Sequence, residues 1–599
     1  MIVPMRKLTA LVFYKDYPLF LEKLRELGVL HIFTKKNINL ENKEINNQMN
    51  TLKAYNDNIK FIKKFFGSNS GSIDEDGKSI FLKIINYRKE LDSISLKLSN
   101  ISKRKDLLMP WGKFDISKLE LLKEAGINLN FYTCASNKYS DKWNDLYNAI
   151  EIEESNGVTY FITITSDKNI DIDAEYFDFG LDSISSLKVK EKEILERKEE
   201  IKRYFEKVAN SISILENERS NIKEDLDYQK IFNSTNYAIE EKLIGLEAWL
   251  PLENEKEISE WIKDKDVYYL IEKPNVEDNV PVKLKNNRFT SLFEMIGKLY
   301  SLPNYNEIDL TPFFAPFYLL FFGLCLGDCG YGLLILGGAT FYKRKVDKKM
   351  KPVITLLQWL GFSTILMGLL VGTFFGINLI NADISFLDGV RDYMLDSNKL
   401  FTFSLILGAI QVVFGMFLKV ANSVKQFGWG AALSTIGWIV LIFGSAVSYY
   451  LKDRGISYYN IVQNGTLILS GILILLLNNP KRNLFINLGS GLWDTYSMVT
   501  GLVGDLLSYI RIFALGVCSG VLGLVFNDIA INLSSGMPPV ISQLFMVIIL
   551  VFGHGINIFM SGLGSMVHPM RLTFVEFYKN AGFSGGGKDY IPFKKIERI

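Results

Sequence analysis

The chain has 599 residues and a formal net charge of +2, with 22% charged and 48% hydrophobic residues. These overall values conceal an abrupt change near residue 310. Residues 1–310 hold 46 Lys or Arg and 52 Asp or Glu, whereas residues 311–599 hold 21 and 13. The first balance is typical of a soluble, mildly acidic region, and the second of a polytopic membrane domain. Neither balance indicates a nucleic-acid-binding protein.

The four cysteines give no sign of a disulfide framework or of a metal site. Cys325 and Cys329 lie four positions apart in an apolar segment, and Cys134 and Cys518 stand alone. We therefore expect no metal and no other cofactor. The N-terminal stretch lacks a basic segment followed by a long apolar one, so no cleaved signal peptide is expected. The first region should remain in the cytosol.

The chain begins with a small α/β lobe that it leaves and later completes. Residues 6–33 read as strand, helix and strand, with Gly28 placed where the helix ends. A strand-like run at 243–251, a helix at 255–263 and a strand at 267–273 supply the missing elements. These patterns predict a proximal lobe made of residues 1–38 and 230–285.

Two helical arms lie between the parts of the proximal lobe. In the return arm, apolar residues recur every seven positions on a charged background, at Leu187, Ile194, Ile201, Val208, Leu215 and Ile222. The outward arm carries a similar seam on both sides of a polar break. Two such seams imply an antiparallel coiled coil over residues 39–106 and 182–229. The segment between them, 107–181, has two strand-like runs around a helix and predicts a distal lobe.

The first region shows no catalytic centre. Residues 71–79 resemble a phosphate-binding P-loop, but five residues separate Gly71 from Gly77 instead of four, and no apolar strand leads into the segment. His31, the region's only histidine, lies in an apolar strand, where a core role is the commoner one. A membrane-anchored enzyme with its own active site is therefore disfavoured.

The second region, 311–599, predicts an all-α membrane domain with about eight transmembrane helices, the last two long and tilted. Basic residues favour a cytosolic N-terminal domain and a cytosolic C-terminus, because the segments then inside carry 15 Lys or Arg and those outside carry four. The expected spans are 312–324, 327–342, 354–376, 400–418, 429–450, 462–477, 491–527 and 538–578.

Arg511 is the one cation in the span at 491–527. A helix of that length would measure about 55 Å, against about 30 Å of bilayer hydrocarbon, so it must tilt, break or protrude. Guanidinium keeps its charge in proteins, and a permanent charge inside a membrane usually marks an ion or substrate path. Asp505 lies six positions away, about 120° around the helix, where intrahelical pairs do not form. The alternative is that another neighbour neutralises Arg511.

The last span, 538–578, holds most of the remaining polar residues of the membrane domain. A polar row on a membrane helix is a candidate water or ion path, and the alternative is hydrogen bonding that only joins the helices. Pro569 removes a backbone donor and is expected to kink the helix. Candidates for the lining of two half-channels, taken from both long spans, are Asp505, Ser508, His554, Asn557, His568 and Glu576.

Three stretches carry a resemblance to a known family. They are YNEIDLTPFFAPFYLLFFGLCLGDCGYGLL at 305–334, GDLLSYIRIFALGV at 504–517, and HPMRLTFVEFYKNAGFSGGGKDYIPF at 568–593. With these stretches the chain resembles subunit I, also called subunit a, of the prokaryotic V-type or A-type rotary ATPases. The resemblance covers the whole chain, with a weaker match at GLEAWLP, residues 245–251.

The resemblance implies a stator that has no active site of its own. The cytosolic half would attach to peripheral-stalk subunits and, indirectly, to the central stalk and the catalytic head, where ATP chemistry takes place. The membrane half would face a rotating ring of proteolipid subunits. Carried over to this chain, the family's essential arginine is Arg511 and its second arginine is Arg571.

Some questions stay open at this point. The sequence does not distinguish proton from sodium transport, because selectivity would lie chiefly in the ring, nor ATP synthesis from hydrolysis. The alternative function is a stand-alone secondary ion transporter with a cytosolic regulatory domain. Such transporters typically show internal repeats with broken helices, and no such duplication is found here.

Overall fold

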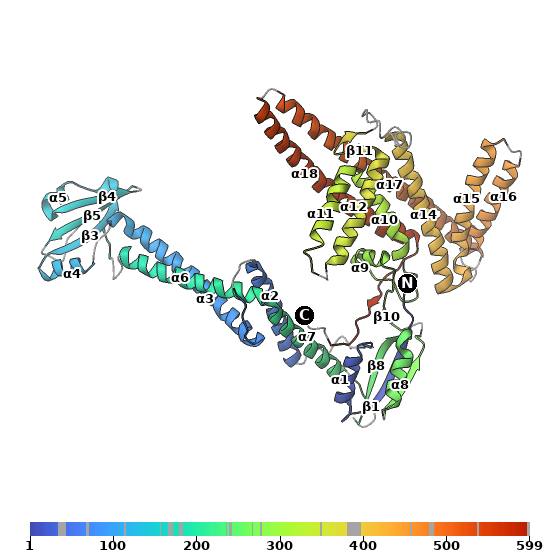
Figure 1. Cartoon of the computed structure of the whole chain (residues 1–599), viewed down its shortest axis with the longest axis horizontal. Coiled ribbons are helices and arrows are strands. Elements are labelled where there is room, and N and C mark those ends of the chain that lie inside the picture. The colour runs from blue at the N-terminus through green and yellow to red at the C-terminus, as the bar shows by residue number, and fades with distance from the viewer. Residues whose placement is uncertain are drawn as a thin grey trace. The chain divides into compact units, whose positions relative to one another are not determined.

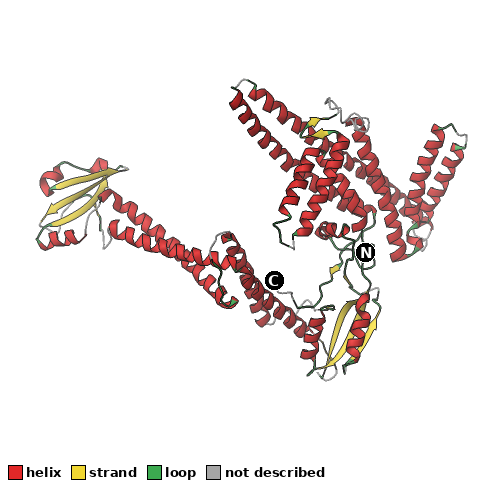
Figure 2. Ribbon diagram, viewed as in Figure 1, coloured by secondary structure: helices red, strands yellow, loops and turns green. Residues whose placement is uncertain are grey.

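The computed structural model is mostly helical, with a few small sheets (Figures 1 and 2). The residues that it describes are 1–33, 43–66, 71–112, 116–155, 157–165, 172–178, 184–234, 236–238, 242–265, 267–275, 278–347, 350–379, 397–455, 458–477, 484–535 and 538–595. The predicted boundaries at 38–39 and at 181–182, and the loop residues Lys348, Lys349, Arg391, Lys481, Arg482 and Arg598 that entered the topology argument, lie outside these ranges.

The chain divides into two compact units. The first contains residues 1–11, 29–31 and 247–592, and the second contains 12–28, 32–246 and 593–599. The membrane helices therefore share a unit with residues 247–310. The lobe boundaries expected from the sequence remain predictions.

One sheet contains strands from both ends of the first half of the chain. Its order is β2-β8-β1-β9, with β7 paired to β8, and the division between the units runs through β1, β2 and β8. Near this sheet in the sequence, α1 ends at Gly28, which has a left-handed φ of 66°, as the pattern predicted. The elements are β1 (Met5–Phe13), α1 (Tyr17–Leu27), β2 (His31–Ile32), β7 (Asn236–Ala238), β8 (Leu243–Pro251), α8 (Glu255–Lys263) and β9 (Tyr268–Glu272).

The second unit holds two antiparallel helical arms. Ion pairs join Lys63 to Glu216, Glu90 to Arg197 and Lys105 to Glu191. The residue numbers therefore increase along one arm in the direction in which they decrease along the other. The hydrogen bond from Arg197 lowers the pKa of Glu90 below its usual value. Buried apolar residues of both arms form one core, which contains Ile59, Ile84, Ile94, Ile201, Val208 and Leu215 from the predicted seams. The coiled-coil supercoil itself stays a prediction.

The arms consist of α2 (Lys43–Ile62), α3 (Gly77–Leu108), α6 (Ile184–Asn210) and α7 (Ile212–Ser234). Between α3 and α6 lies an antiparallel sheet of order β4-β5-β3-β6. Its elements, with two short helices, are α4 (Ile116–Glu124), β3 (Asn128–Ala135), α5 (Lys142–Tyr147), β4 (Ala149–Ser155), β5 (Val158–Thr165) and β6 (Glu175–Tyr176).

In the first unit, the described part of the chain has six helices that are long and apolar enough to cross a membrane, and two shorter apolar ones. The short ones are α10 (Thr311–Leu326) and α11 (Cys329–Tyr342), so a count of eight spans stays a prediction. The long ones are α12 (Lys351–Val371), α14 (Ser397–Phe427), α15 (Leu433–Asp453), α16 (Tyr459–Gly471, continued by a π-helical turn), α17 (Leu484–Ser534) and α18 (Pro539–Arg571).

Short elements complete the first unit. A hairpin of β11 (Thr373–Phe374) and β12 (Ile377–Asn378) follows α12, and α9 (Glu294–Tyr300) precedes α10. Near the C-terminus, β13 (Lys588–Asp589) pairs in parallel with β10 (Pro281–Val282). Buried aromatic residues of α10 and of the segment after α18 share one core, including Phe314, Tyr318, Phe577 and Tyr578.

Of the two long helices, α17 is longer than predicted, whereas α18 has 33 residues and ends before the predicted span 538–578 does. Helix α17 has 51 residues, about 76 Å, instead of the 37 expected. Helix α18 contains Pro569, and the chain then takes a wider π-helical turn over Leu572–Phe577 before α19 (Tyr578–Asn580). Such π turns are commonly found at functional sites.

Candidate functional site

Helices α17 and α18 pack against each other in antiparallel directions. Asn527 contacts His554, Ser519 contacts Asn557, and Asp505 contacts Asn580 near the other end of the pair. The sum of the two residue numbers is nearly constant along this contact. Arg511 therefore lies at the level of residues 568–571.

The side chain of Arg511 has an unpaired donor. Its Nη1 atom is buried and has no hydrogen-bond partner, and among the described residues no carboxylate lies within ion-pair distance of the guanidinium. Its helix neighbours Tyr509 and Ile512 are buried in an apolar core. Leaving a donor of a charged group unsatisfied in such surroundings is unfavourable, so the site is suited to an acceptor from outside the chain.

His568 adds a second unpaired atom at the same level. Its Nδ1 is buried without a partner, and the positive charges of Arg511 and Arg571 both act on the imidazole. The side chain of Arg571 is exposed. The structure thus brings Arg511, His568 and Arg571 to the same level of the two helices, and among the described residues neither arginine forms an ion pair.

On the side of Arg511 toward the start of α17, two carboxylates are buried. Asp505 accepts a hydrogen bond from Asn580 Nδ2 at 2.7 Å and pairs with Lys579 Nζ at 3.3 Å. Glu576 is only 2% exposed, and its Oε2 has no partner. The hydroxyl of Ser508 lies against the Glu576 carboxyl. Asp505 is thus paired with α19 and not with Arg511, as its angular position predicted.

We use the name Arg511 group for Arg511, His568 and Glu576. Each of these side chains has a buried polar atom with no partner in the described part of the chain. Buried polar atoms are nearly always hydrogen-bonded in folded proteins, and the exceptions call for an explanation.

On the other side of Arg511, a second set of polar side chains is fully bonded. The Asn527 amide donates to Phe375 O at 2.8 Å, so its Oδ1 faces His554 Nε2 at 3.1 Å. An amide oxygen only accepts, so Nε2 carries the proton and Nδ1 accepts from the Tyr331 hydroxyl at 2.8 Å. Asn557 Nδ2 donates to the Tyr331 hydroxyl at 2.8 Å and to Ser519 O at 2.9 Å. We call Tyr331, Asn527, His554 and Asn557 the Tyr331 cluster.

Comparison with known proteins decides the family. Residues 176–381 match the model of the V-type ATPase 116kDa subunit family. The "V-type ATP synthase subunit I" of Borreliella burgdorferi is 26% identical over 626 residues, which cover all of both chains. The "A-type ATP synthase subunit I" of Methanocaldococcus jannaschii is 32% identical over 58% of this chain and 54% of its own length. The "V-type ATP synthase subunit I 1" of Treponema pallidum is 22% identical over 99% of this chain.

The chain belongs to this family. It is a multi-pass membrane subunit of a V-type or A-type rotary ATPase, and its partners are other subunits of that complex. The family model covers Asp328, Tyr331 and the hairpin β11–β12 but not Arg511, whereas the match to the Borreliella burgdorferi relative covers the whole chain.

Within this subunit, several residues of the two polar sets were not singled out from the sequence. Tyr331, Asn527, Lys579 and Asn580 complete the hydrogen bonds of predicted candidates, from positions as far as 226 residues away. Tyr331 lies in the family-like stretch 305–334. Its polar side chain in a short apolar helix was the signal that could have marked it as a candidate. Nothing in the spacing of Asn580 pointed to Asp505.

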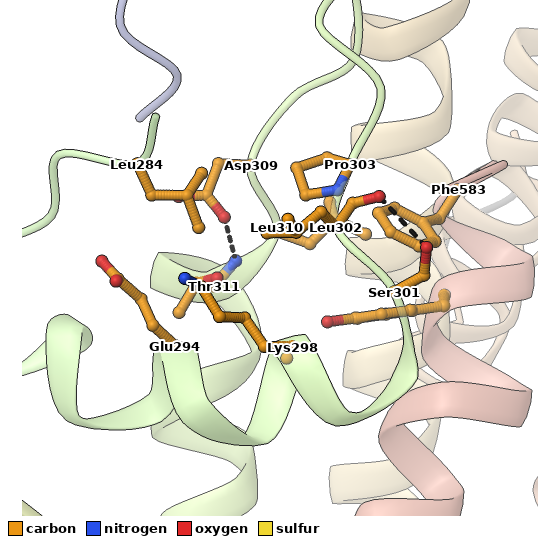
Figure 3. Close-up of a pocket in the computed structure, with 12 residues that line it drawn as sticks. Leu284, Glu294, Lys298, Ser301, Leu302, Pro303, Asp309, Leu310, Thr311 and Phe583 are labelled. Carbon is orange, nitrogen blue, oxygen red and sulfur yellow. Dashed lines mark hydrogen bonds between the residues drawn. The ribbon is translucent and has the colours of Figure 1, made fainter. Parts of the chain in front are cut away.

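In the described part of the chain, cavities also lie away from the two long helices. One of about 330 Å³ is lined in part by Asp278, Tyr305 and Gln426. A cavity beside α9 holds about 10 Å³, room for one water, and is lined in part by Glu294, Asp309 and Thr311 (Figure 3). Asp309 Oδ1 accepts from Thr311 N at 2.9 Å, and burial raises the pKa of Glu294. Among the described residues, no group of three His, Cys, Asp or Glu side chains could hold a metal.

His31 is half-buried and not a core residue, contrary to what its apolar strand suggested. Its Nδ1 lies 2.9 Å from Ile591 O and 3.1 Å from Ile591 N, so the ring bonds the backbone beside β13. Gly77, from the P-loop-like stretch, begins α3, and a Cβ atom there would lie 3.0 Å from Glu218 Cβ. At Gly77 this stretch therefore packs closely against α7.

Proposed function

We propose that this chain is the membrane stator of the rotary ATPase, and that it couples translocation of protons or sodium ions to rotation of a proteolipid ring. Arg511 would displace the ion from each carboxylate that the ring brings past it. The subunit would carry no ATP chemistry, which would take place on other subunits. Its partners would be the ring and the peripheral stalks directly, and the central stalk and catalytic head indirectly.

The unpaired, buried Nη1 of Arg511 is the observation that carries this proposal. Arg511 is half-buried, and a charged donor atom that is buried without an acceptor is costly, so a carboxylate arriving from a partner would remove that cost. At about 4 Å and an effective dielectric of 20, the attraction is about 4 kcal/mol before desolvation. That energy corresponds to about three pKa units in favour of the ion-free, charged carboxylate.

Arginine suits this role better than lysine. A buried lysine can release its proton and lose its charge, whereas guanidinium stays charged. A permanent charge between two half-channels would also oppose direct passage of cations from one to the other. We therefore place Arg511 at the barrier of the path, with Arg571 in a supporting role because its side chain is exposed.

For the half-channels, the polar groups on the two sides of Arg511 support different roles. Asp505, Ser508 and Glu576 lie on one side and would line one half-channel, with His568 beside the barrier. On the other side, the bonds of His554 and Asn557 are satisfied within the chain, which favours the alternative of joining helices for these two candidates.

We also propose that the N-terminal domain and the C-terminus are cytosolic. The basic residues of the expected inside loops support this orientation, 15 against four. In that orientation the Asp505 side of Arg511 faces the cytosol, and the Tyr331 cluster lies toward the opposite surface.

The proposal is tested by Arg511→Ala in the complete complex, reconstituted into liposomes. ATP-driven ion uptake should be abolished while the complex still assembles, because the charge that empties the ring site is gone. Arg511→Lys should also be impaired, since a desolvated lysine can lose its proton. Arg454→Ala is the matched control, because Arg454 lies at the end of α15 with its guanidinium over the Tyr450 ring. Normal coupled pumping by Arg511→Ala would contradict the proposal.

A further inference from the structure

The hairpin β11–β12 inserts its tip between three helices. The two tip residues, Phe375 and Gly376, both have left-handed backbone conformations, with φ of 47° and 74°. Positive φ at both central residues is the type I′ hairpin turn. Glycine adopts this conformation easily, but a bulky residue such as Phe375 keeps it only where its surroundings enforce it.

Asp328 supplies that enforcement. The carboxylate is fully buried between α10 and α11 and caps α11 by accepting from Tyr331 N at 3.1 Å. It also accepts from Phe375 N at 3.0 Å and from Gly376 N at 2.8 Å. A buried carboxylate without a cation is stable only when several donors hydrogen-bond to it. Asp328 therefore needs these three amides, and the conformation of the tip in turn needs Asp328.

The tip also holds both long helices. Asn527 of α17 donates to Phe375 O at 2.8 Å, and the Phe375 ring packs at 5.6 Å from the rings of Tyr331 and His554. A Cβ atom on Gly376 would lie 2.2 Å from Gly523 C of α17, and a Cβ on Gly523 would lie 2.8 Å from Gly376 Cα. The two backbones therefore touch at a point where neither residue can carry a side chain.

We propose that the Phe375–Gly376 tip is the fixed point against which α17 is seated, and that Asp328, Gly376 and Gly523 are positioning residues for Arg511. Twelve residues, about 18 Å of helix, separate Gly523 from Arg511, and α17 is continuously helical between them. A displacement at Gly523 is thus carried along a stiff element to the guanidinium. This inference rests on the proposed role of Arg511.

The test compares two glycine substitutions one turn apart on α17. The methyl group added by Gly523→Ala forces the tip and the helix apart. The methyl group added by Gly520→Ala lies 3.6 Å from Thr373 Cγ2, which is an ordinary contact. Each variant complex is reconstituted into liposomes, and the number of ions taken up per ATP hydrolysed is measured. We expect the ratio to fall about tenfold or more for Gly523→Ala, since misplacement of a functional group by about 1 Å can cost up to 100-fold. For Gly520→Ala it should stay at the wild-type value.

The ratio separates positioning from mere loss of stability. A destabilised subunit would lower the yield of assembled complex but leave the ions moved per ATP unchanged. If Gly523→Ala does not assemble, Asp328→Asn is the second variant, because it keeps the side-chain volume and removes one acceptor oxygen; we expect a smaller fall in the same ratio. An unchanged ratio in the assembled variant, or an equal fall for Gly520→Ala, would overturn the inference.

Arg511→Ala, measured in parallel, separates this inference from the proposed function. If Arg511→Ala abolishes pumping while Gly523→Ala and Asp328→Asn keep the wild-type ratio, only the positioning inference fails. If Arg511→Ala pumps normally, the proposed function itself fails.

Discussion

The Tyr331 cluster and the Arg511 group are built on the same two helices yet differ in one physical respect. In the Tyr331 cluster each named side chain is hydrogen-bonded within the chain, whereas each member of the Arg511 group keeps a buried atom without a partner. Satisfied polar atoms stabilise a single arrangement of helices, and unsatisfied ones raise the energy of the isolated subunit. Under the proposed function, missing partners and not polarity alone would mark the ion path.

Apart from changes at Arg511 itself, Glu576→Gln should have the largest effect on ion uptake among the substitutions that test this comparison. The substitution keeps the shape of the side chain but removes an ionisable group that is 2% exposed and partly unpaired. We expect ATP-driven ion uptake to fall about fivefold, as for a barrier raised by about 1 kcal/mol. Uptake is measured in liposomes at equal amounts of assembled complex. Ser508→Ala, which removes the neighbouring hydroxyl, should act in the same direction; wild-type uptake by Glu576→Gln would remove Glu576 from the path.

Arg571→Ala should have a smaller effect. Its side chain is exposed in the isolated chain and leaves no buried atom unpaired, and its charge reaches His568 and Glu576 without a direct ion pair. We expect uptake to fall about twofold to threefold, equivalent to less than 1 kcal/mol. The comparison variant is Arg511→Ala in the same assay. A loss as complete as that of Arg511→Ala would show that burial is the wrong basis for ranking the two arginines.

Asn557→Ala should have the smallest effect on transport and should act on stability. The substitution removes two donated hydrogen bonds and the acceptor of Ser561 Oγ, which lies 3.0 Å away. We expect a loss of about 1–2 kcal/mol of stability, measured as a lower midpoint of thermal unfolding of the purified complex. Ser561→Ala, which deletes one of these bonds, should cost less. A large fall in ions moved per ATP, with unchanged thermal stability, would return Asn557 to the half-channel.

Much of the fold was predictable because hydropathy and spacing act locally. The apolar runs located the helices of the membrane half, and the strand and helix patterns at 6–33 agree with β1, α1 and β2. The length of α17 was underestimated because polar residues at its ends do not stop a helix that is supported by its neighbours. Helix α18 ends earlier than predicted because the chain passes into a π-helical turn at Leu572. The two short helices α10 and α11 leave the number of spans as a prediction.

For the site, the sequence by itself determined that Arg511 is a permanent charge in an apolar helix and that Asp505 does not share its face. These conclusions follow from side-chain chemistry and the helical repeat, which are local. Only the tertiary structure decided which polar atoms find partners. Tyr331 and Asn557 are 226 residues apart, and Asp505 and Asn580 are 75 apart, so their bonds depend on how separate helices pack. The same packing leaves Arg511 unpaired, because no helix of the described chain brings a carboxylate to it.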